Sequence, residues 1–194
     1  MKFLTPLLTL TLALRSASAF APLPASARAA TATFATKAKA YPIMAEEDVM
    51  SQKEHGTSAQ PVQKKLRWNC DFGTADRICN FNRHYAEFAG YWQTTDFLKS
   101  LAEEEKPIQF YDSVTGAQLF TAPVGRTMED FLVESQKHGW PSFRDEEVNW
   151  DYVRCLKDGE CVSTTGTHLG HNLPDKTGNR YCINLVSVAG QPEE

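Results

Sequence analysis

Short stretches rich in strand-forming residues, separated by Gly, Asp and Asn, fill the C-terminal half of the chain. This pattern is typical of an antiparallel β domain, in which brief strands are joined by tight turns. Upstream of them, Ser113–Gly116 predicts a hairpin turn between two further strands. We expect strands at Ile108–Tyr111, Gln118–Phe120, Val148–Leu156, Cys161–Ser163, Leu169–Leu173 and Arg180–Val188.

Three other segments have helical patterns. Asn82–Phe88 predicts a short helix, and a second helix begins at Thr95-Asp96 and stops before Pro107. The third has a capping arrangement at Thr127–Asp130 and Gly139 just past its end. The whole pattern predicts a mainly β domain of the α+β class with a helical N-terminal part, and 194 residues suffice for one such domain.

The N-terminus has the pattern of a targeting sequence in two parts. Residues 1–19 predict a secretory signal, since an apolar stretch ends in the small residues Ala17-Ser18-Ala19. Residues 20–45 are rich in Ala, Ser and Thr and carry only basic charge, as in a transit peptide. The junction with Phe20 resembles the bipartite plastid-targeting signals of algae with secondary plastids. We therefore expect the plastid stroma as the location, with a secreted protein as the alternative.

The net charge of the chain limits the classes of partner that it can bind. The chain has 24 acidic and 20 basic residues, and five of the basic ones lie in residues 1–45, which contain no acid. The remainder therefore has 15 basic against 24 acidic residues, a net charge of -9. Such a chain is a poor candidate for nucleic-acid binding, which needs clustered Lys and Arg. No apolar run beyond the N-terminus is long enough to cross a bilayer, so we expect no membrane partner for the mature chain. We also expect a monomer without nucleic-acid partners.

The segment Arg180–Leu185 concentrates reactive groups on one face. In a strand, Arg180, Cys182 and Asn184 share one side, while the apolar residues between them face the core. An adjacent Arg favours the thiolate, which is the form that attacks. Taken alone, however, this strand fits a semi-buried cysteine with polar neighbours better than a nucleophile.

Two histidines and an aspartate precede this strand. His168 and His171 would point to opposite faces of a regular strand, so their convergence needs a bend, which Gly170 permits. With Asp175, they offer hydrogen-bond donors and an acid for protonating an oxygen. The same three residues leave open a small mononuclear metal protein, although the chain has no Cys-x-x-Cys pair to complete a zinc site.

These motifs together carry a family resemblance. Gly166–His171, Asp175, Arg180–Asn184 and the loop His138–Phe143 resemble the signature of the B-type peptide methionine sulfoxide reductases, which act on the R epimer. The resemblance covers residues 108–190 and implies two antiparallel β-sheets, the β-tent of that family. The expected divisions are a signal at 1–19, a transit-like segment at 20–45, a disordered linker at 46–63, a helical and aromatic extension at 64–107 and the reductase domain at 108–190.

The resemblance also implies roles. Cys182 would be the nucleophile that becomes a sulfenic acid while methionine is released. Trp140 and Phe143 would bind the substrate, with Trp140 as an aromatic wall against its methyl group. The side chains that orient and protonate the sulfoxide oxygen, or support that step, would be His168, His171, Asp175, Arg180 and Asn184. The substrate would be methionine-R-sulfoxide, either free or in oxidised proteins.

Two departures from the family pattern concern thiols. The positions of four zinc-binding cysteines are occupied by Asp112, Thr115, Val162 and Thr165, so we expect neither structural zinc nor another cofactor. The usual resolving cysteine is replaced by His138. The sulfenic acid would then be reduced directly by an external thiol of the thioredoxin or glutaredoxin type, or by one of Cys70, Cys79, Cys155 and Cys161, of which Cys70 and Cys79 also fit buried, inert thiols. A non-catalytic binding or redox-sensing relative of the same fold is the other alternative.

Overall fold

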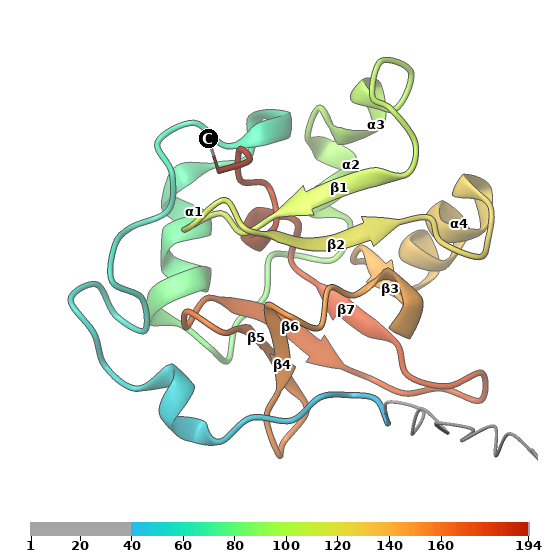
Figure 1. The fold of residues 1–194 in the computed structure, drawn as a ribbon. Coiled ribbons are helices and arrows are strands. Elements are labelled where there is room, and N and C mark those ends of the chain that lie inside the picture. The colour runs from blue at the N-terminus through green and yellow to red at the C-terminus, as the bar shows by residue number, and fades with distance from the viewer. Residues whose placement is uncertain (1–39, 194) are drawn as a thin grey trace, which may run out of the picture. The chain divides into compact units, whose positions relative to one another are not determined.

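The computed structural model describes residues 40–193, which contain two antiparallel sheets and several short helices (Figure 1). One sheet pairs β1 (Ile108–Tyr111) with β2 (Gln118–Ala122). The second has five strands in the order β3-β7-β6-β5-β4. These strands are β3 (Ser142–Phe143), β4 (Val153–Cys155), β5 (Glu160–Ser163), β6 (His168–Asn172) and β7 (Tyr181–Ile183). The expected mixed α+β class with two antiparallel sheets is confirmed.

Helix α4 (Met128–His138) begins and ends as its sequence predicts. Thr127 accepts a hydrogen bond from the Asp130 N–H, and the Asp130 carboxylate accepts one from the Thr127 N–H, which completes a capping box. Gly139 ends the helix at φ 91°, a conformation that favours glycine. Phe131 is fully buried and packs its helix against the aromatic residues of both sheets.

The other helices lie only partly where expected. No helix forms at Asn82–Phe88; instead α1 (Phe72–Asp76), capped by Asp71, continues as a π-helical turn over Arg77–Phe81. The expected helix after Thr95-Asp96 is confirmed but brief, as α3 (Phe97–Ser100), and is preceded by α2 (Tyr91–Thr94). The remaining 3-10 turns are Glu47–Met50, Arg67–Asn69, Asp145–Glu147 and Leu185–Ser187. Among residues 40–193, every helix is too short or too polar to span a membrane.

Two expected strands are shorter than the sequence suggested. The first half of Val148–Leu156 is a turn, and only Val153–Cys155 pairs in the sheet. The strand expected at Arg180–Val188 ends at Ile183. The physical reason lies in Glu87, whose buried carboxylate accepts the backbone N–H groups of Leu185 and Val186 that a neighbouring strand would otherwise satisfy.

Residues 46–63 are not the disordered linker that we expected. Glu47–Met50 form a 3-10 turn, and Met50 and Val62 are buried against the domain. Met44 pairs with Cys155 as a parallel bridge beside β4, so the folded domain already includes the last residues of the expected 20–45 segment. The expected signal at 1–19 and most of that segment lie outside the described residues.

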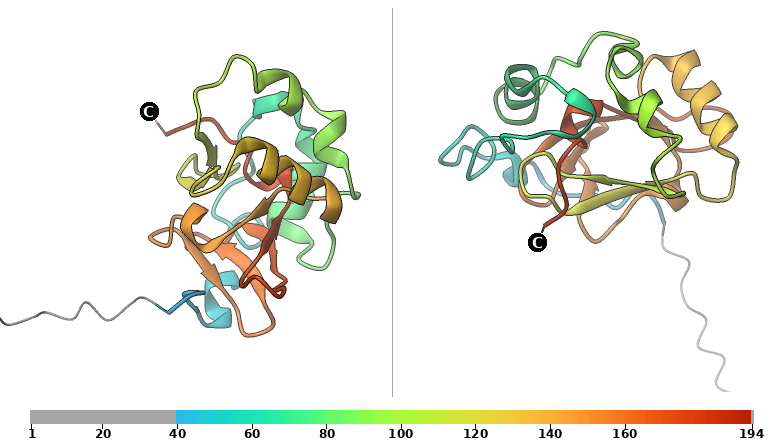
Figure 2. Two further views of the ribbon diagram at one scale, coloured as in Figure 1. Left: turned by 90° about the vertical axis from the view of Figure 1, so that its right-hand side faces the viewer. Right: turned by 90° about the horizontal axis from the view of Figure 1, so that it is seen from above.

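The 64–107 extension packs against the C-terminal segment (Figure 2). Cys79, in the π-helical turn, donates a thiol hydrogen bond to Ser187 Oγ at 3.5 Å. Arg67 N–H donates to the Ala189 carbonyl at 2.6 Å. The extension is therefore part of one hydrophobic core with the two sheets.

Candidate functional site

Four neighbouring strands place a row of polar side chains on one face of the larger sheet. Ser142 on β3 pairs with Cys182 on β7, Cys182 pairs with His171 on β6, and His171 pairs with Glu160 on β5. Directly opposed residues of an antiparallel sheet point to the same side. Tyr181 and Ile183, which alternate with Cys182, belong to the hydrophobic core on the other face.

A β-bulge brings His168 onto the face of His171. Val162 pairs with His168 while Cys161 pairs with Gly170, so Leu169 is the additional residue of β6. Since Glu160 and Val162 share a face of β5, their partners His171 and His168 share one as well, and the two imidazole rings lie 5.7 Å apart. Gly170 is required at this point, because a Cβ there would lie 2.0 Å from the Cys182 carbonyl oxygen. The two histidines therefore converge on one face, which a regular strand would not allow.

A cavity of about 280 Å³ opens over this row. It is lined by His84, Tyr85, Ala86, Trp140, His168, Gly170, His171, Leu173, Cys182 and Asn184. Cys182 is only 9% exposed, so a reagent reaches its thiol through this cavity. The extension supplies three lining residues, at 84–86, that have no counterpart in the sequence prediction.

Cys182 is held by two polar neighbours. The Arg180 Nη1 group donates a hydrogen bond to Cys182 Sγ, and Ser142 Oγ lies 3.8 Å from the same sulfur. Arg180 Nε lies 3.6 Å from Asp175 Oδ2. Asp175 therefore reaches the thiol only through Arg180 and does not line the cavity with the histidines.

His168 contacts the buried carboxylate of Glu160, which is also paired with Arg83 and was not predicted from the sequence. His168 Nδ1 lies 2.7 Å from Glu160 Oε1, and Arg83 Nε donates to Glu160 Oε2 at 3.0 Å. Burial raises the pKa of Glu160, but the hydrogen bonds from His168 and Arg83 outweigh it and hold the pKa below its usual value. The ionised carboxylate accepts only, so Nδ1 of His168 carries the hydrogen. Glu160 gave no sequence signal because its partners lie 8 and 77 residues away.

His171 has a different environment from His168. Burial, and to a smaller extent the neighbouring His168, lower its pKa below the usual value. Its imidazole is therefore neutral at physiological pH.

Glu87 fixes the cavity wall. Its backbone N–H donates to Asn184 Oδ1, and its carbonyl accepts from Trp140 Nε1, each at 3.1 Å. Its carboxylate accepts from Leu185 and Val186, and burial raises its pKa to about 8. Trp140 and Asn184 line the cavity, but Trp140 Nε1 donates to the Glu87 carbonyl and Asn184 Nδ2 to the Leu169 carbonyl of β6, so neither N–H group points free into it.

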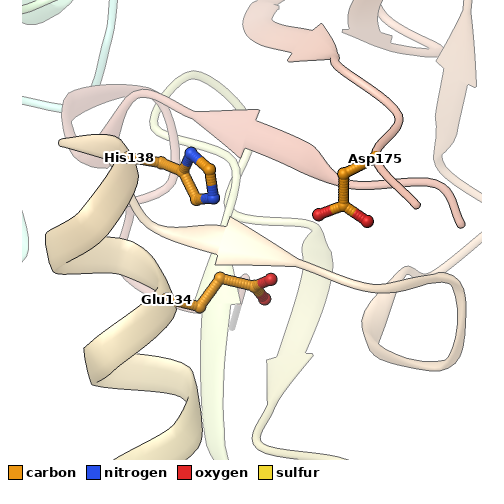
Figure 3. A group of neighbouring side chains, drawn as sticks. All are labelled: Glu134, His138 and Asp175. Carbon is orange, nitrogen blue, oxygen red and sulfur yellow. The ribbon is translucent and has the colours of Figure 1, made fainter. Parts of the chain in front are cut away.

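A second cluster lies beside Arg180, where Glu134 and His138 of α4 approach Asp175 (Figure 3). One donor atom from each lies within 4.8 Å of the others. Arg126 Nη1 lies 2.5 Å from Glu134, and Arg144 Nη2 lies 2.9 Å from Asp175, so two guanidinium groups already neutralise the carboxylates. In the described part of the chain, no such cluster combines Asp175 with the two histidines of the cavity.

Phe143 does not line the cavity, contrary to expectation. It faces away from Ser142 and is fully buried, with its ring 4.4 Å from that of Phe120 and 5.0 Å from that of Phe110. Strand alternation sends adjacent residues to opposite faces, so the loop that delivers Trp140 to the cavity delivers Phe143 to the core.

The four positions at which the resemblance expects zinc-binding cysteines lie together only in part. Asp112, Thr115 and Thr165 line a cavity of about 180 Å³, whereas Val162 packs with Met50 and Leu156. Ser163, and not Val162, lines this cavity. These carboxylate and hydroxyl oxygens do not fit zinc, which prefers thiolate and imidazole ligands in structural sites.

None of the other cysteines lies beside Cys182 in the sheet. Cys155 and Cys161 belong to the core face, whereas Cys182 faces the cavity. Cys161 is two strands away, at a Cα separation of roughly 10 Å, against the 4.4–6.8 Å that a disulfide needs. Cys70 and Cys79 are buried, and desolvation raises the pKa of both thiols.

Part of the chain is homologous to known reductases. It is 41% identical over 68 residues to the peptide methionine sulfoxide reductase MsrB of Leifsonia xyli subsp. xyli, covering 29% of this chain and 48% of that protein. The MsrB of Methanosarcina mazei is 42% identical over 67 residues, covering 29% and 47%. For the MsrB of Escherichia coli O139:H28 the identity is 38% over 65 residues, covering 26% and 44%.

The chain therefore spans about half the length of the curated relatives it matches. No family model matches it. No solved structure matches it either. The similarity thus indicates distant, partial homology to the MsrB proteins.

Proposed function

We propose that this protein reduces methionine-R-sulfoxide to methionine, with Cys182 as the nucleophile. The observation that carries the proposal is the position of Cys182 in a cavity shared with Trp140, His168 and His171. The partial homology to MsrB proteins supports the same reaction class.

The cavity suits a methyl sulfoxide. The face of Trp140 offers apolar contact for the substrate methyl group, and its orientation is fixed by the bond to the Glu87 carbonyl. His168 and His171 line the same cavity and offer imidazole groups for the sulfoxide oxygen. The substrate sulfur would then face Cys182, which lines the cavity with them.

The Cys182 thiol alone suffices to reduce the sulfoxide. The Cys182 sulfur, stabilised as an anion by the Arg180 guanidinium, attacks the sulfoxide sulfur while a proton is delivered to the oxygen. The protonated oxygen then moves from the substrate sulfur to Cys182, so that the sulfur–oxygen bond of the substrate and the transient sulfur–sulfur bond both break. Methionine leaves reduced by two electrons, and Cys182 becomes a sulfenic acid. A positioned proton donor contributes about 10²–10⁴-fold to such a step.

Cys182 is then regenerated by an external dithiol of the thioredoxin or glutaredoxin type. Two thiols give up their hydrogens and form a disulfide, while the sulfenic oxygen leaves as water. An external donor is favoured because the four other cysteines are buried and Cys155 and Cys161 face the opposite side of the sheet.

The test is an assay of the full-length chain with dabsyl-methionine-R-sulfoxide, the S epimer and dithiothreitol. We expect reduction of the R epimer alone, its loss in Cys182→Ser, and its retention in the matched control Cys155→Ser. If wild type and Cys182→Ser gave the same yield, the proposal would be wrong. Binding of the R epimer without turnover would instead favour the non-catalytic relative.

A further inference from the structure

Two thiols outside the candidate site lie against each other. Cys155 Sγ and Cys161 Sγ are 3.4 Å apart, and both side chains are at most 1% exposed. They belong to neighbouring strands, β4 and β5, and are directly opposed in the register. Nothing in the proposed reduction uses this pair.

The hydrogen-bond pattern shows which kind of cross-strand pair they form. The next pair along the ladder, Leu156 and Glu160, is hydrogen-bonded, since the Leu156 N–H donates to the Glu160 carbonyl at 2.8 Å. Hydrogen-bonded and non-hydrogen-bonded pairs alternate in an antiparallel ladder, so Cys155 and Cys161 form a non-hydrogen-bonded pair. The backbone of Cys155 bonds outward instead, to Ile43 and Ala45.

This geometry suits a covalent bond. Non-hydrogen-bonded pairs have Cα atoms about 4.5 Å apart and the closest side chains of the sheet. A disulfide requires a Cα separation of about 4.4–6.8 Å, so the pair meets the requirement without a change of register.

We propose that Cys155 and Cys161 form a reversible cross-strand disulfide with each other. The oxidant is a small disulfide or a hydroperoxide. With a disulfide, one cysteine displaces a thiol from the oxidant, and the other displaces the second thiol, so that two protons and two electrons leave the pair. With a hydroperoxide, one thiol becomes a sulfenic acid and the other displaces water.

Access to the pair runs past the segment 41–45. This segment covers the edge of β4 through two backbone hydrogen bonds to Cys155, each 2.9 Å long, and a stack of Tyr41 on Trp150. Such an edge can open locally without unfolding of the whole domain. Burial raises the pKa of the Cys161 thiol, so oxidation is faster in alkaline buffer.

The five cysteines fall on five different tryptic peptides, which makes the test sharp. Cleavage after Arg154 and Lys157 leaves Cys155 in residues 155–157, Cys161 in 158–176 and Cys182 in 181–194. The full-length protein is incubated with oxidised glutathione, or separately with hydrogen peroxide, at pH 7 and pH 9. It is then denatured in the presence of N-ethylmaleimide, which alkylates the free thiols, and is digested with trypsin without reductant.

The expected product is a linked peptide of residues 155–157 and 158–176, with two hydrogens fewer than the sum of its parts. In Cys182→Ser, where the reactive thiol of the cavity is absent, alkylated thiols fall from four to two, and dithiothreitol restores them. Cys182→Ser retains the link, whereas Cys155→Ser and Cys161→Ser abolish it. A link between 158–176 and 181–194, or full alkylation of both thiols after oxidation, would overturn the proposal. The result is independent of the reductase activity, because Cys182→Ser is inactive by the proposed function yet keeps the link.

Discussion

His168 Nδ1 lies 2.7 Å from Glu160 Oε1, with both side chains almost completely buried. The carboxylate fixes the hydrogen on Nδ1 and the orientation of the ring, while Arg83 holds the carboxylate from the other side. Because His168 also lines the cavity, this pair couples the extension to the side chain that would face a bound sulfoxide oxygen. Glu160 is thus a positioning residue for the proposed reaction.

Glu160→Gln is expected to reduce kcat for the R epimer by about tenfold or more, since a misoriented imidazole loses part of its contribution to proton transfer. KM should change much less, because Glu160 does not line the cavity. The pH dependence of kcat should also shift. The measurement is steady-state kinetics between pH 6 and 9.

Glu146→Gln is the matched control, because Glu146 is exposed in the 3-10 turn Asp145–Glu147. It should leave kcat, KM and the pH profile unchanged. Equal loss of kcat and of thermal stability in Glu160→Gln, with an unchanged pH profile, would instead indicate a purely structural role.

Local patterns predicted the elements that are determined by neighbouring residues. The Thr127–Asp130 capping box and Gly139 predicted the two ends of α4. The turn at Ser113–Gly116 predicted the β1–β2 hairpin. The shared face of Cys182 and Asn184 followed from strand alternation. In contrast, Phe143 was misplaced because a family motif does not say which face each of its residues takes.

Long-range contacts were not accessible from sequence. Glu87 ends the last strand early by accepting two N–H groups from residues about 98 positions away. The extension has no match among the family motifs, yet residues 84–86 line the cavity. A bulge, set by the pairing of β6 with β5, decides that His168 and His171 converge.

Glu87 makes the stability of the fold depend on pH. Burial raises its pKa to about 8 from the ordinary 4.5, so between these values the folded chain holds a proton that the unfolded chain has released. The free energy of unfolding therefore falls as pH rises from about 4.5 to about 8, by at most about 1.4 kcal/mol per pH unit from this group.

Glu87→Gln should remove this slope, because the amide does not titrate. The variant should also be about 1–2 kcal/mol less stable than wild type at pH 5, since the amide NH₂ cannot accept one of the two backbone N–H groups. Urea unfolding at pH 5, 6, 7 and 8 measures both effects. The stability gap between wild type and variant should narrow as pH rises; a gap that widens would contradict the assignment.

Residues 1–40 are predicted to direct the protein to the plastid. A fusion of these residues to a fluorescent protein should enter plastids when it is expressed in an alga with secondary plastids. We place the boundary at residue 40 because Tyr41 already stacks on Trp150 in the folded domain. Phe20→Ala is the informative variant, since the resemblance to bipartite signals rests on that position. Export of the fusion from the cell would support the secreted alternative.

Asp112 links the β1–β2 hairpin to the β5–β6 hairpin at the place where the resemblance expects zinc cysteines. Its buried carboxylate accepts the Val114 N–H at 2.8 Å and the Thr167 hydroxyl at 2.9 Å. Asp112→Ala leaves both donors buried and unpaired, at about 1–3 kcal/mol each, so we expect a loss of about 3 kcal/mol or more in the free energy of unfolding.

Asp112→Asn keeps one acceptor oxygen and should lose less than Asp112→Ala, and Asp151→Ala, at an exposed position, should be neutral. Urea unfolding with and without a chelator separates this hydrogen-bond link from a metal. If the oxygen ligands held a cation, the chelator would destabilise wild type and leave Asp112→Ala unchanged. We expect the chelator to have no effect on either protein, because Asp112 already bonds to protein donors that replace the cross-link a zinc ion would supply.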